Sequence, residues 1–273
     1  MHVVFWGPAA GQTGTTSSLT AAALMAAYRY EKKVLLTQTH YHNREMEEVL
    51  LGGVQKEELY RDIGIDAILR LIRTGNFIAN SDTESLIRNF ILSVGKGGVN
   101  LLPGTSGEYS KALEGDMSAY LPYLYGSLKG SYDMIFTDAV SGDNPVSRML
   151  WKEADILAVT LSQNKAVIKE CLLQYQFPFE KTVFLIGSYQ KASVNTIKNL
   201  EKTYQELKGR LYAVPYHTSY MDVLSEGMCQ ELFLKSLAFK NKAGLTEFFS
   251  YVSKLTEMLL DKASDEGGAG LDI

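Results

Sequence analysis

The feature that most constrains the fold of this chain is the order strand, glycine-containing loop, helix and strand at its start. Residues 2–6 (HVVFW) predict a short buried strand, and residues 33–39 (KVLLTQT) predict a second one. Residues 15–30 between them predict a helix rich in Ala, Leu and Met, with Thr and Ser hydroxyls at its start. This is a βαβ unit, and such units build parallel sheets.

The same alternation continues along nearly the whole chain. Further strands are predicted at 98–102, 132–138, 155–161, 182–187 and 211–214, and further helices at 63–74, 83–94, 115–128, 165–176, 193–208 and 243–261. We therefore expect a single α/β domain over residues 1–262, with a mainly parallel sheet covered by helices on both faces. The acidic, Gly-rich segment 263–273 is expected to be a disordered tail.

Composition excludes several classes of protein. A chain of 273 residues that is 46% hydrophobic can bury a full core. Its net charge of −4 argues against a general nucleic-acid binder. The two cysteines, Cys171 and Cys229, lie far apart without CxxC spacing, so a disulfide framework or a zinc site is not expected. No basic region precedes the short apolar start, and no apolar run approaches the roughly 20 residues that span a bilayer, so we expect a cytoplasmic protein.

The loop after the first strand resembles a phosphate-binding loop that lacks its lysine. Residues 9–16 (AAGQTGTT) fit the pattern GxxxxGK[ST] at Gly14 and Thr16, but Ala9 replaces the first glycine and Thr15 replaces the lysine. The loop follows a strand and opens a helix, which is the setting that such a loop needs. The alternative is a plain strand-to-helix turn capped by Thr and Ser.

The loss of the lysine should weaken phosphate binding without abolishing it. Backbone N–H groups and the helix N-terminus attract phosphate by themselves, and Gly11 and Gly14 allow the backbone to curl. A charge-assisted hydrogen bond contributes roughly 1.5–3 kcal/mol, or about tenfold to a hundredfold in affinity. The residues expected to contact a nucleotide are Gly11, Gln12, Thr13, Gly14, Thr15, Thr16 and Ser17, with the Thr16 hydroxyl also placed to contact Mg²⁺.

Four segments in register resemble the ParA/MinD group of deviant Walker A ATPases. They are the loop with its flanking elements, YDMIFTDAVSG (132–142), EADILAVTLSQNKAVIKE (153–170) and VPYHTSYMDVLSEGMCQELF (214–233). The resemblance covers roughly residues 2–260 and implies a P-loop NTPase fold. Within the group, IGIDAILRLIRTG (63–75) and NLLPGTS (100–106) resemble the atypical TadZ proteins that accompany Tad (Flp) pilus machinery.

The resemblance also assigns roles outside the loop. It implies that Asp138 holds Mg²⁺ through water, that Gly142 is the switch glycine near the γ-phosphate, and that Pro215 lines the base. Each has a plain alternative: a polar strand end for Asp138, a turn for Gly142, and the end of a strand for Pro215.

The departures from the family pattern point away from catalysis. The signature lysine of the family falls on Ala10, and the two aspartates of its DxD motif fall on Gln38 and His40. The resemblance therefore implies a TadZ-like positioning scaffold with a degenerate loop, little or no ATP hydrolysis, and ATP or ADP with Mg²⁺ as a weak ligand, if it binds one. It further implies a homodimer, pilus-assembly or polar-localisation proteins as partners, and recruitment to a membrane site or pole through them.

Four alternatives stay open at this stage. A weakly active ATPase of the partitioning or septum-placement kind could use His40 or Gln38 to position water. DNA partitioning would need a local basic patch. Membrane docking would use the apolar stripe of residues 246–262, for which core packing is the other explanation. His40 and His42, two residues apart, could chelate a metal ion from the end of a strand.

Overall fold

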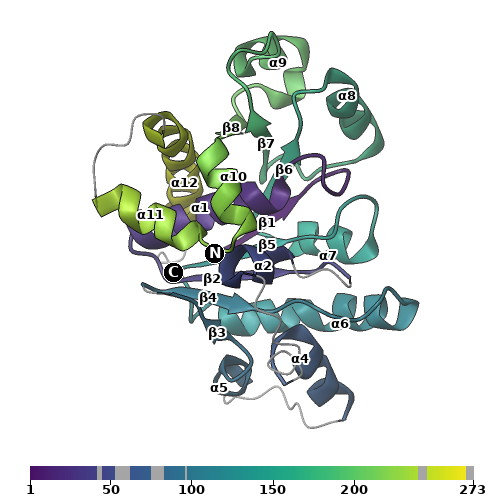
Figure 1. Cartoon of the computed structure of the whole chain (residues 1–273). Coiled ribbons are helices and arrows are strands. Elements are labelled where there is room, and N and C mark those ends of the chain that lie inside the picture. Colours follow the sequence, from purple (N-terminus) through teal and green to yellow (C-terminus); the bar gives the residue numbers. More distant parts are fainter. Residues whose placement is uncertain (42–44, 53–61, 75–82, 96, 239–244, 269–273) are drawn as a thin grey trace.

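The computed structural model describes residues 1–41, 45–52, 62–74, 83–95, 97–238 and 245–268, and within them an eight-stranded sheet in the order β3-β4-β2-β5-β1-β6-β7-β8 (Figure 1). The strands are β1 (His2–Trp6), β2 (Val34–Gln38), β3 (Leu92–Ser93), β4 (Val99–Leu102), β5 (Met134–Asp138), β6 (Ile156–Leu161), β7 (Thr182–Tyr189) and β8 (Leu211–Pro215). Neighbouring strands pair in parallel except β3 with β4. The expected α/β fold with a mainly parallel sheet is confirmed.

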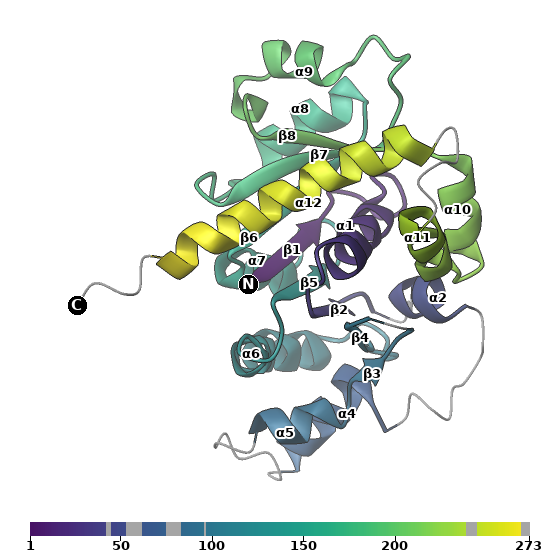
Figure 2. The same ribbon diagram turned by 90° about the vertical axis from the view of Figure 1, so that its left-hand side faces the viewer.

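Helices cover both faces of this sheet (Figures 1 and 2). They are α1 (Thr15–Arg29), α2 (Glu45–Leu51), α4 (Gly64–Arg73), α5 (Thr83–Arg88), α6 (Lys111–Leu128), α7 (Pro145–Glu153), α8 (Lys165–Gln174), α9 (Ile197–Thr203), the 3₁₀ turn η1 (Gln205–Leu207), α10 (Thr218–Ser225), α11 (Cys229–Ala238) and α12 (Leu245–Gly268). In β1, Val4 and Trp6 pack into one hydrophobic cluster while Val3 and Phe5 pack into the other. Strand side chains alternate between faces, so an uninterrupted apolar strand is what two covered faces require.

Helix α1 is enclosed between the sheet and other helices. Its residues are buried without interruption from Ser18 to Ala27, and α12 crosses beside it (Figure 2). Small Ala side chains let the surrounding elements approach closely. The apolar stripe of α12, including Phe248, Val252 and Leu255, is buried in the same cluster as α1. This stripe therefore packs in the core. Core packing, one of the two explanations given for residues 246–262, is confirmed.

Several predicted boundaries were wrong for local reasons. The helix expected over 83–94 ends at Arg88, and β3 follows it. The helix expected over 193–208 begins only at Ile197, where the Thr196 side chain caps it, and breaks at the extended residue Tyr204. Helix α6 begins earlier than expected because the Ser110 hydroxyl accepts from the Leu113 amide.

Other differences concern elements that were not predicted at all. Helices α2, α7, α10 and α11 lie between the predicted elements. Helix α12 runs to Gly268, so it includes the first part of the tail expected over 263–273, and residues 269–273 lie outside the described residues. Within the described residues, none of the helices combines the length and the apolar character that crossing a membrane requires.

The site follows from the sheet order. Strands β1, β2 and β5 are neighbours, in the order β2-β5-β1. Their carboxyl ends therefore meet at one edge, where the loops after Trp6, Gln38 and Asp138 lie close together. The loop after β1 and Asp138 at the end of β5 carry residues that the sequence predicted to contact a nucleotide or Mg²⁺.

Candidate functional site

The loop between β1 and α1 has the backbone curl expected of a phosphate-binding loop. Gly11 and Gly14 have φ angles of 69° and 67°, in the left-handed region that glycine adopts at least cost. Gly14 is the residue directly before α1, and its carbonyl accepts from the Ser18 amide. The free N–H groups of the first helical turn therefore face the loop, which is an arrangement that attracts anions.

Two further glycines, which were not among the predicted nucleotide contacts, fix the close packing of the loop. A Cβ atom on Gly7 would lie 2.4 Å from Thr13 Oγ1, and one on Gly187 would lie 2.0 Å from the Thr13 carbonyl oxygen. The end of β7 therefore presses directly against the loop. The available sequence signal was their position at the ends of two apolar strands.

The threonine that stands in the place of the lysine is engaged inside the loop. Thr15 Oγ1 lies 3.0 Å from Thr13 Oγ1, at hydrogen-bond distance. Thr13 itself is buried. The hydroxyl pair keeps the loop compact but supplies no positive charge.

Thr16 and Asp138 are in direct contact. The Thr16 hydroxyl donates to Asp138 Oδ2 at 2.6 Å, from the first turn of α1 to the end of β5. The same hydroxyl lies 3.0 Å from Glu45 Oε2 at the start of α2. His40 Nε2 lies 3.3 Å from the other oxygen, Asp138 Oδ1. Thr16, His40, Glu45 and Asp138 thus form one polar cluster, and Asp138 at its centre is fully buried.

The charges of this cluster shift the pKa of His40. Burial by itself lowers the pKa of His40, but the Asp138 carboxylate raises it, helped by the charges of Glu45 and Glu47, and the net shift is upward. The imidazole therefore holds its proton more readily than a free histidine. As an imidazolium it is a cation paired with Asp138.

Gln38 is not available to position water. Its side-chain amide donates to Glu47 Oε2 at 3.0 Å and its carbonyl oxygen accepts from the Met46 amide at 3.1 Å. Glu47 is buried and also accepts from the Gly104 amide at 2.9 Å. These contacts fasten α2 to the carboxyl edge of the sheet and so place Glu45 beside Thr16. Sequence reasoning missed Glu45 and Glu47, although the acidic run EMEE after the second strand was the available signal.

Gly142 is hydrogen-bonded to the residue that precedes the loop and does not line the cavity there. Its φ is 76°, its amide donates to the Gly7 carbonyl at 3.1 Å, and its own carbonyl accepts from Trp6 Nε1 at 3.1 Å. Tyr220 of α10, also missed from the sequence, donates to the Ser17 carbonyl at 2.6 Å. The segment around Gly142 and helix α10 thus hold the phosphate-loop region through hydrogen bonds to its backbone carbonyls.

A cavity of about 360 Å³ opens at this edge. Of the predicted nucleotide contacts, Gly11, Gly14, Thr15, Thr16 and Ser17 line it, whereas Gln12, Thr13, Asp138, Gly142 and Pro215 do not. Pro215 ends β8. Glu45, Glu48 and His40 add charge to the lining, and Val49, Met221 and Leu224 add apolar surface. The volume is near the lower limit for small-molecule sites.

Solved structures place this architecture among known folds. MinD from Pyrococcus horikoshii, complexed with Mg-ADP, is 16% identical, with 96% of this chain and 99% of that chain covered and a TM-score of 0.65. A ParA-family ATPase from Chlorobium tepidum is 13% identical, with 93% and 98% covered and a TM-score of 0.65. The chain has the ParA/MinD fold. A chain of the MinC:MinD complex from Aquifex aeolicus is also similar, at 14% identity, 100% and 98% coverage and a TM-score of 0.62.

Sequence comparisons alone do not reach this result. No protein-family model matches the chain, and no curated protein matches it. Since the identities to the three structures are 13–16%, they establish the ParA/MinD fold and nothing finer.

The residues at the site fit a nucleotide cradle in part. The Thr16 hydroxyl and the Asp138 carboxylate are oxygen donors of the kind that Mg²⁺ prefers, and the curled loop with the start of α1 suits phosphate. Among the described residues that line the cavity there is neither lysine nor arginine. The described residues also contain no group of three His, Cys, Asp or Glu side chains able to hold a metal ion by themselves, and His42 lies outside them. Bound magnesium would polarise a phosphate oxygen.

Proposed function

We propose that this chain is a positioning scaffold built on the ParA/MinD fold, with little or no ATP hydrolysis and a nucleotide as a structural ligand at most. The observation that carries the proposal is the polar cluster of Thr16, His40, Glu45 and Asp138. The groups that would meet Mg²⁺ already contact one another: the Thr16 hydroxyl donates to Asp138 Oδ2, and His40 Nε2 lies 3.3 Å from Asp138 Oδ1, although these last two atoms form no hydrogen bond with any described residue. The two positions where the resemblance expects lysine hold Ala10 and Thr15.

Loss of the lysines affects catalysis more than binding. The loop amides and the start of α1 attract phosphate in the ground state. Charge that develops during phosphoryl transfer needs cations placed in advance, and those lysines would supply them. The scaffold therefore retains weak affinity for ATP or ADP while it turns over little or none.

We further propose that the scaffold is TadZ-like and acts in the assembly or placement of a Tad pilus. Support comes from the two segments that carry this resemblance, which form one hydrogen-bonded unit. Asp66 of α4 accepts from the Thr105 hydroxyl at 2.5 Å and from the Ser106 amide at 2.8 Å. Deletion of the gene in its source organism should reduce surface pili or misplace them. Wild-type pili at wild-type positions would contradict the pilus role.

The chain is proposed to act as a homodimer with pilus-assembly or polar-localisation proteins as partners. The cross-subunit contact of the signature lysine is missing at Ala10, so dimerisation would rest on other apolar and polar surface. Sedimentation at several salt concentrations tests this. A dimer that persists without nucleotide supports the proposal, and a strict monomer at high concentration contradicts it.

The deciding test of the nucleotide role is calorimetric titration with Mg-ATP and Mg-ADP after bound nucleotide has been stripped, together with a phosphate-release assay. Micromolar binding without phosphate release would mean that the backbone cradle suffices for a structural ligand. No heat at millimolar nucleotide would place the function wholly in protein contacts. Sustained phosphate release that Asp138→Asn abolishes would overturn the scaffold proposal.

One observation favours a weak ATPase as the second candidate, since His40 lines the cavity next to Asp138. A histidine acts as a base only in its neutral form, which the raised pKa of His40 makes less populated. If phosphate release were found, His40→Ala should remove it under this alternative. Release that survives the substitution would eliminate His40 as the base.

A further inference from the structure

A second hollow lies away from the phosphate loop, between α7 and the segment 175–181 that joins α8 to β7. We call it the aromatic groove. Its volume is about 690 Å³, and it shares no lining residue with the cavity at the loop. Trp151, Tyr175 and Phe177 line it together with Arg148, Lys152 and Lys181.

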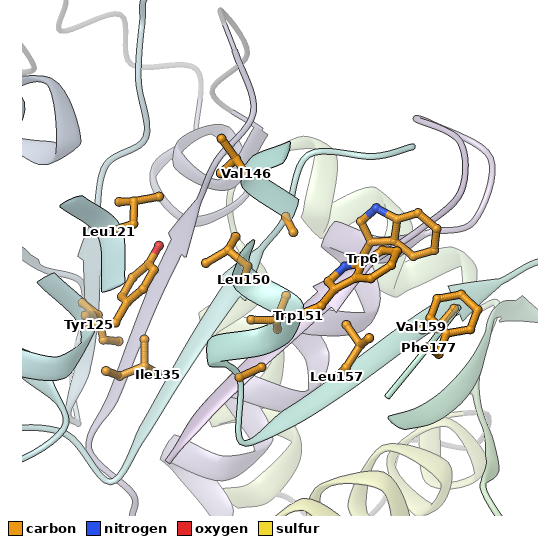
Figure 3. Packing of buried hydrophobic residues seen from close by; sticks show 14 of the residues in the cluster. Trp6, Leu121, Tyr125, Ile135, Val146, Leu150, Trp151, Leu157, Val159 and Phe177 are labelled. Carbon is orange, nitrogen blue, oxygen red and sulfur yellow. The ribbon is translucent and has the colours of Figure 1, made fainter. Parts of the chain in front are cut away.

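The aromatic wall of the groove continues into the core. Trp6 packs edge-on against Trp151, with ring centroids 4.7 Å apart, and Trp151 lies 5.4 Å from Phe177 (Figure 3). Trp6 also packs edge-on against Tyr175, with centroids 4.8 Å apart. Trp6 is fully buried and Trp151 nearly so, while Tyr175 is half-buried. Such edge-to-face packing fixes the rings. Tyr175 is therefore the ring that the groove exposes most, and the buried rings of Trp151 and Phe177 hold it from behind.

The rim of the groove is basic on a chain whose net charge is −4. Asp143 holds the Arg148 guanidinium through two contacts of 2.6 and 2.7 Å. Lys181 Nζ donates to the carbonyls of Lys152 and Ala154, which fastens it over the end of α7. Outside the Arg148–Asp143 pair, the lining carries two lysines and one carboxylate, Glu180, and Glu170 beyond the lining accepts from the Gln174 side chain at 2.9 Å.

Lys152 is the rim cation that is open to a partner. Its side chain is exposed, and it forms no salt bridge with any residue in the described ranges. A charge at a rim steers and selects a partner of opposite sign.

Two large, exposed apolar side chains are sequence neighbours of residues that line the groove. Leu173, which directly precedes the lining residue Gln174, is 76% exposed, and Phe179, between Pro178 and Glu180, is 38% exposed. An aromatic recess with apolar neighbours and a charged rim is the usual anatomy of a protein contact site.

We propose that the aromatic groove is a docking site for an acidic segment of a partner protein, which inserts an apolar side chain against Trp151 and Tyr175. The basic rim selects the acidic residues, and the rigid rings receive the apolar one. This role goes beyond the scaffold proposal, because it requires neither a nucleotide nor the pilus assignment.

The docking site is also connected to the phosphate loop. Trp6 contacts Trp151 on one side and donates its indole N–H to the Gly142 carbonyl on the other. Gly142 in turn donates to the Gly7 carbonyl. A segment docked in the groove therefore touches the ring stack whose far end holds the loop.

The test uses the full chain and a defined probe. The probe is an acetylated and amidated heptapeptide of five glutamates and two phenylalanines, EEFEEFE. In one control peptide glutamine replaces glutamate, and in the other alanine replaces phenylalanine. The only two tryptophans of the chain, Trp6 and Trp151, both lie in the ring stack, and the peptides contain none. Tryptophan emission therefore reports on the groove directly, and calorimetry gives the affinity.

The acidic peptide should shift the emission and bind, and each control peptide should bind roughly tenfold more weakly or worse. Lys152→Glu should weaken binding of the acidic peptide by about the same factor. Its matched control is Lys198→Glu on α9, an exposed lysine without a salt bridge in the described chain. This variant makes the same change in net charge and should bind within about twofold of the wild type.

Three results would overturn the proposal. They are no heat and no emission change with millimolar acidic peptide, equal binding by Lys152→Glu and the wild type, and equal binding of the glutamine peptide. An oligonucleotide that binds more tightly than the acidic peptide and loses affinity in Lys152→Glu would make the groove a nucleic-acid site instead. Lys152 is exposed, so the variant is expected to fold, which circular dichroism verifies.

Discussion

His40 and Asp138 face each other at the carboxyl edge of the sheet, with Nε2 of the histidine 3.3 Å from Oδ1 of the aspartate. The other oxygen of Asp138 accepts from Thr16. Each oxygen of this fully buried carboxylate thus lies next to a protein side chain. In a ParA/MinD fold whose cavity lining has neither lysine nor arginine among the described residues, this pairing leaves a phosphate little besides backbone amides to bind.

Restoring the lysine should therefore restore affinity. Thr15→Lys places an ammonium on the cavity wall, where Thr15 now pairs only with Thr13. One charge-assisted hydrogen bond contributes roughly 1.5–3 kcal/mol, so Mg-ATP should bind about tenfold to a hundredfold more tightly. Calorimetric titration measures the change.

The control for this gain is the same charge at another point of the cavity. Ser141 also lines it, so Ser141→Lys adds the same ammonium away from the start of α1. Its effect on affinity should be clearly smaller. An equal gain from both variants would mean that net charge alone attracts the nucleotide and that the loop has no special geometry.

Removing a negative charge from the cavity should also tighten nucleotide binding. Glu45 lies 3.0 Å from the Thr16 hydroxyl, so its carboxylate opposes a phosphate there. Loss of roughly 1 kcal/mol of repulsion in Glu45→Gln should tighten Mg-ADP binding about fivefold. Glu48→Gln is the matched control, because Glu48 lines the same cavity without a contact to Thr16. Weaker binding by Glu45→Gln would show that Glu45 supports the ligand.

Much of this fold could be predicted because its signals are local. The buried strands are mostly apolar runs, and polar or glycine-containing turns separate them from the helices that follow. The loop after β1 and the carboxylate at the end of β5 could be assigned to one edge, because parallel strands direct their carboxyl ends to the same side. The contact between Thr16 and Asp138 follows from that topology.

The part that could not be predicted depends on α2. This helix is only seven residues long, too short to be stable by itself. Tertiary contacts stabilise it, above all those of the buried Glu47 with Gln38 and the Gly104 amide. Only when α2 is placed this way does Glu45 reach Thr16. Gly187 was likewise invisible as part of the loop, because its partner Thr13 is far away in the sequence.

Gly187 gives a direct test of how tightly the loop is packed. A Cβ at this position would lie 2.0 Å from the Thr13 carbonyl oxygen, and backbone atoms cannot move away cheaply. Gly187→Ala should lower the free energy of unfolding by about 1–3 kcal/mol, as overpacking does. Urea denaturation measures it.

The matched control, Gly126→Ala, is expected to change the free energy of unfolding in the opposite direction. Gly126 lies within α6, and a Cβ there meets nothing within 4 Å. Gly126→Ala should raise stability by about 0.5–1 kcal/mol, since alanine favours the helix. If Gly187→Ala were as stable as the wild type, the loop would have room to shift, and the close packing described above would be wrong.

The last prediction concerns His2, the first residue of β1, and the response of the whole fold to acid. Burial lowers the pKa of His2 to about 3, although Asp155 acts against the shift. The ring is fully buried, with Nε2 2.8 Å from Thr137 Oγ1 and its centroid 4.5 Å from that of Tyr125. The folded chain therefore keeps this imidazole neutral where the unfolded chain protonates it.

The sign of the effect follows from that difference. The unfolded chain gains a proton near pH 6.5, and the folded chain does not until about pH 3. The free energy of unfolding therefore does not depend on His2 above about pH 7.5. From about pH 6.5 down to about pH 3 it falls by about 1.4 kcal/mol per pH unit. Between pH 7 and pH 4.5 the loss should be about 2.5 kcal/mol larger in the wild type than in His2→Gln, which cannot titrate. Urea denaturation at several pH values decides: parallel pH profiles for the wild type and His2→Gln would mean that His2 is protonated in the folded protein, and that the polar end of β1 is open to water.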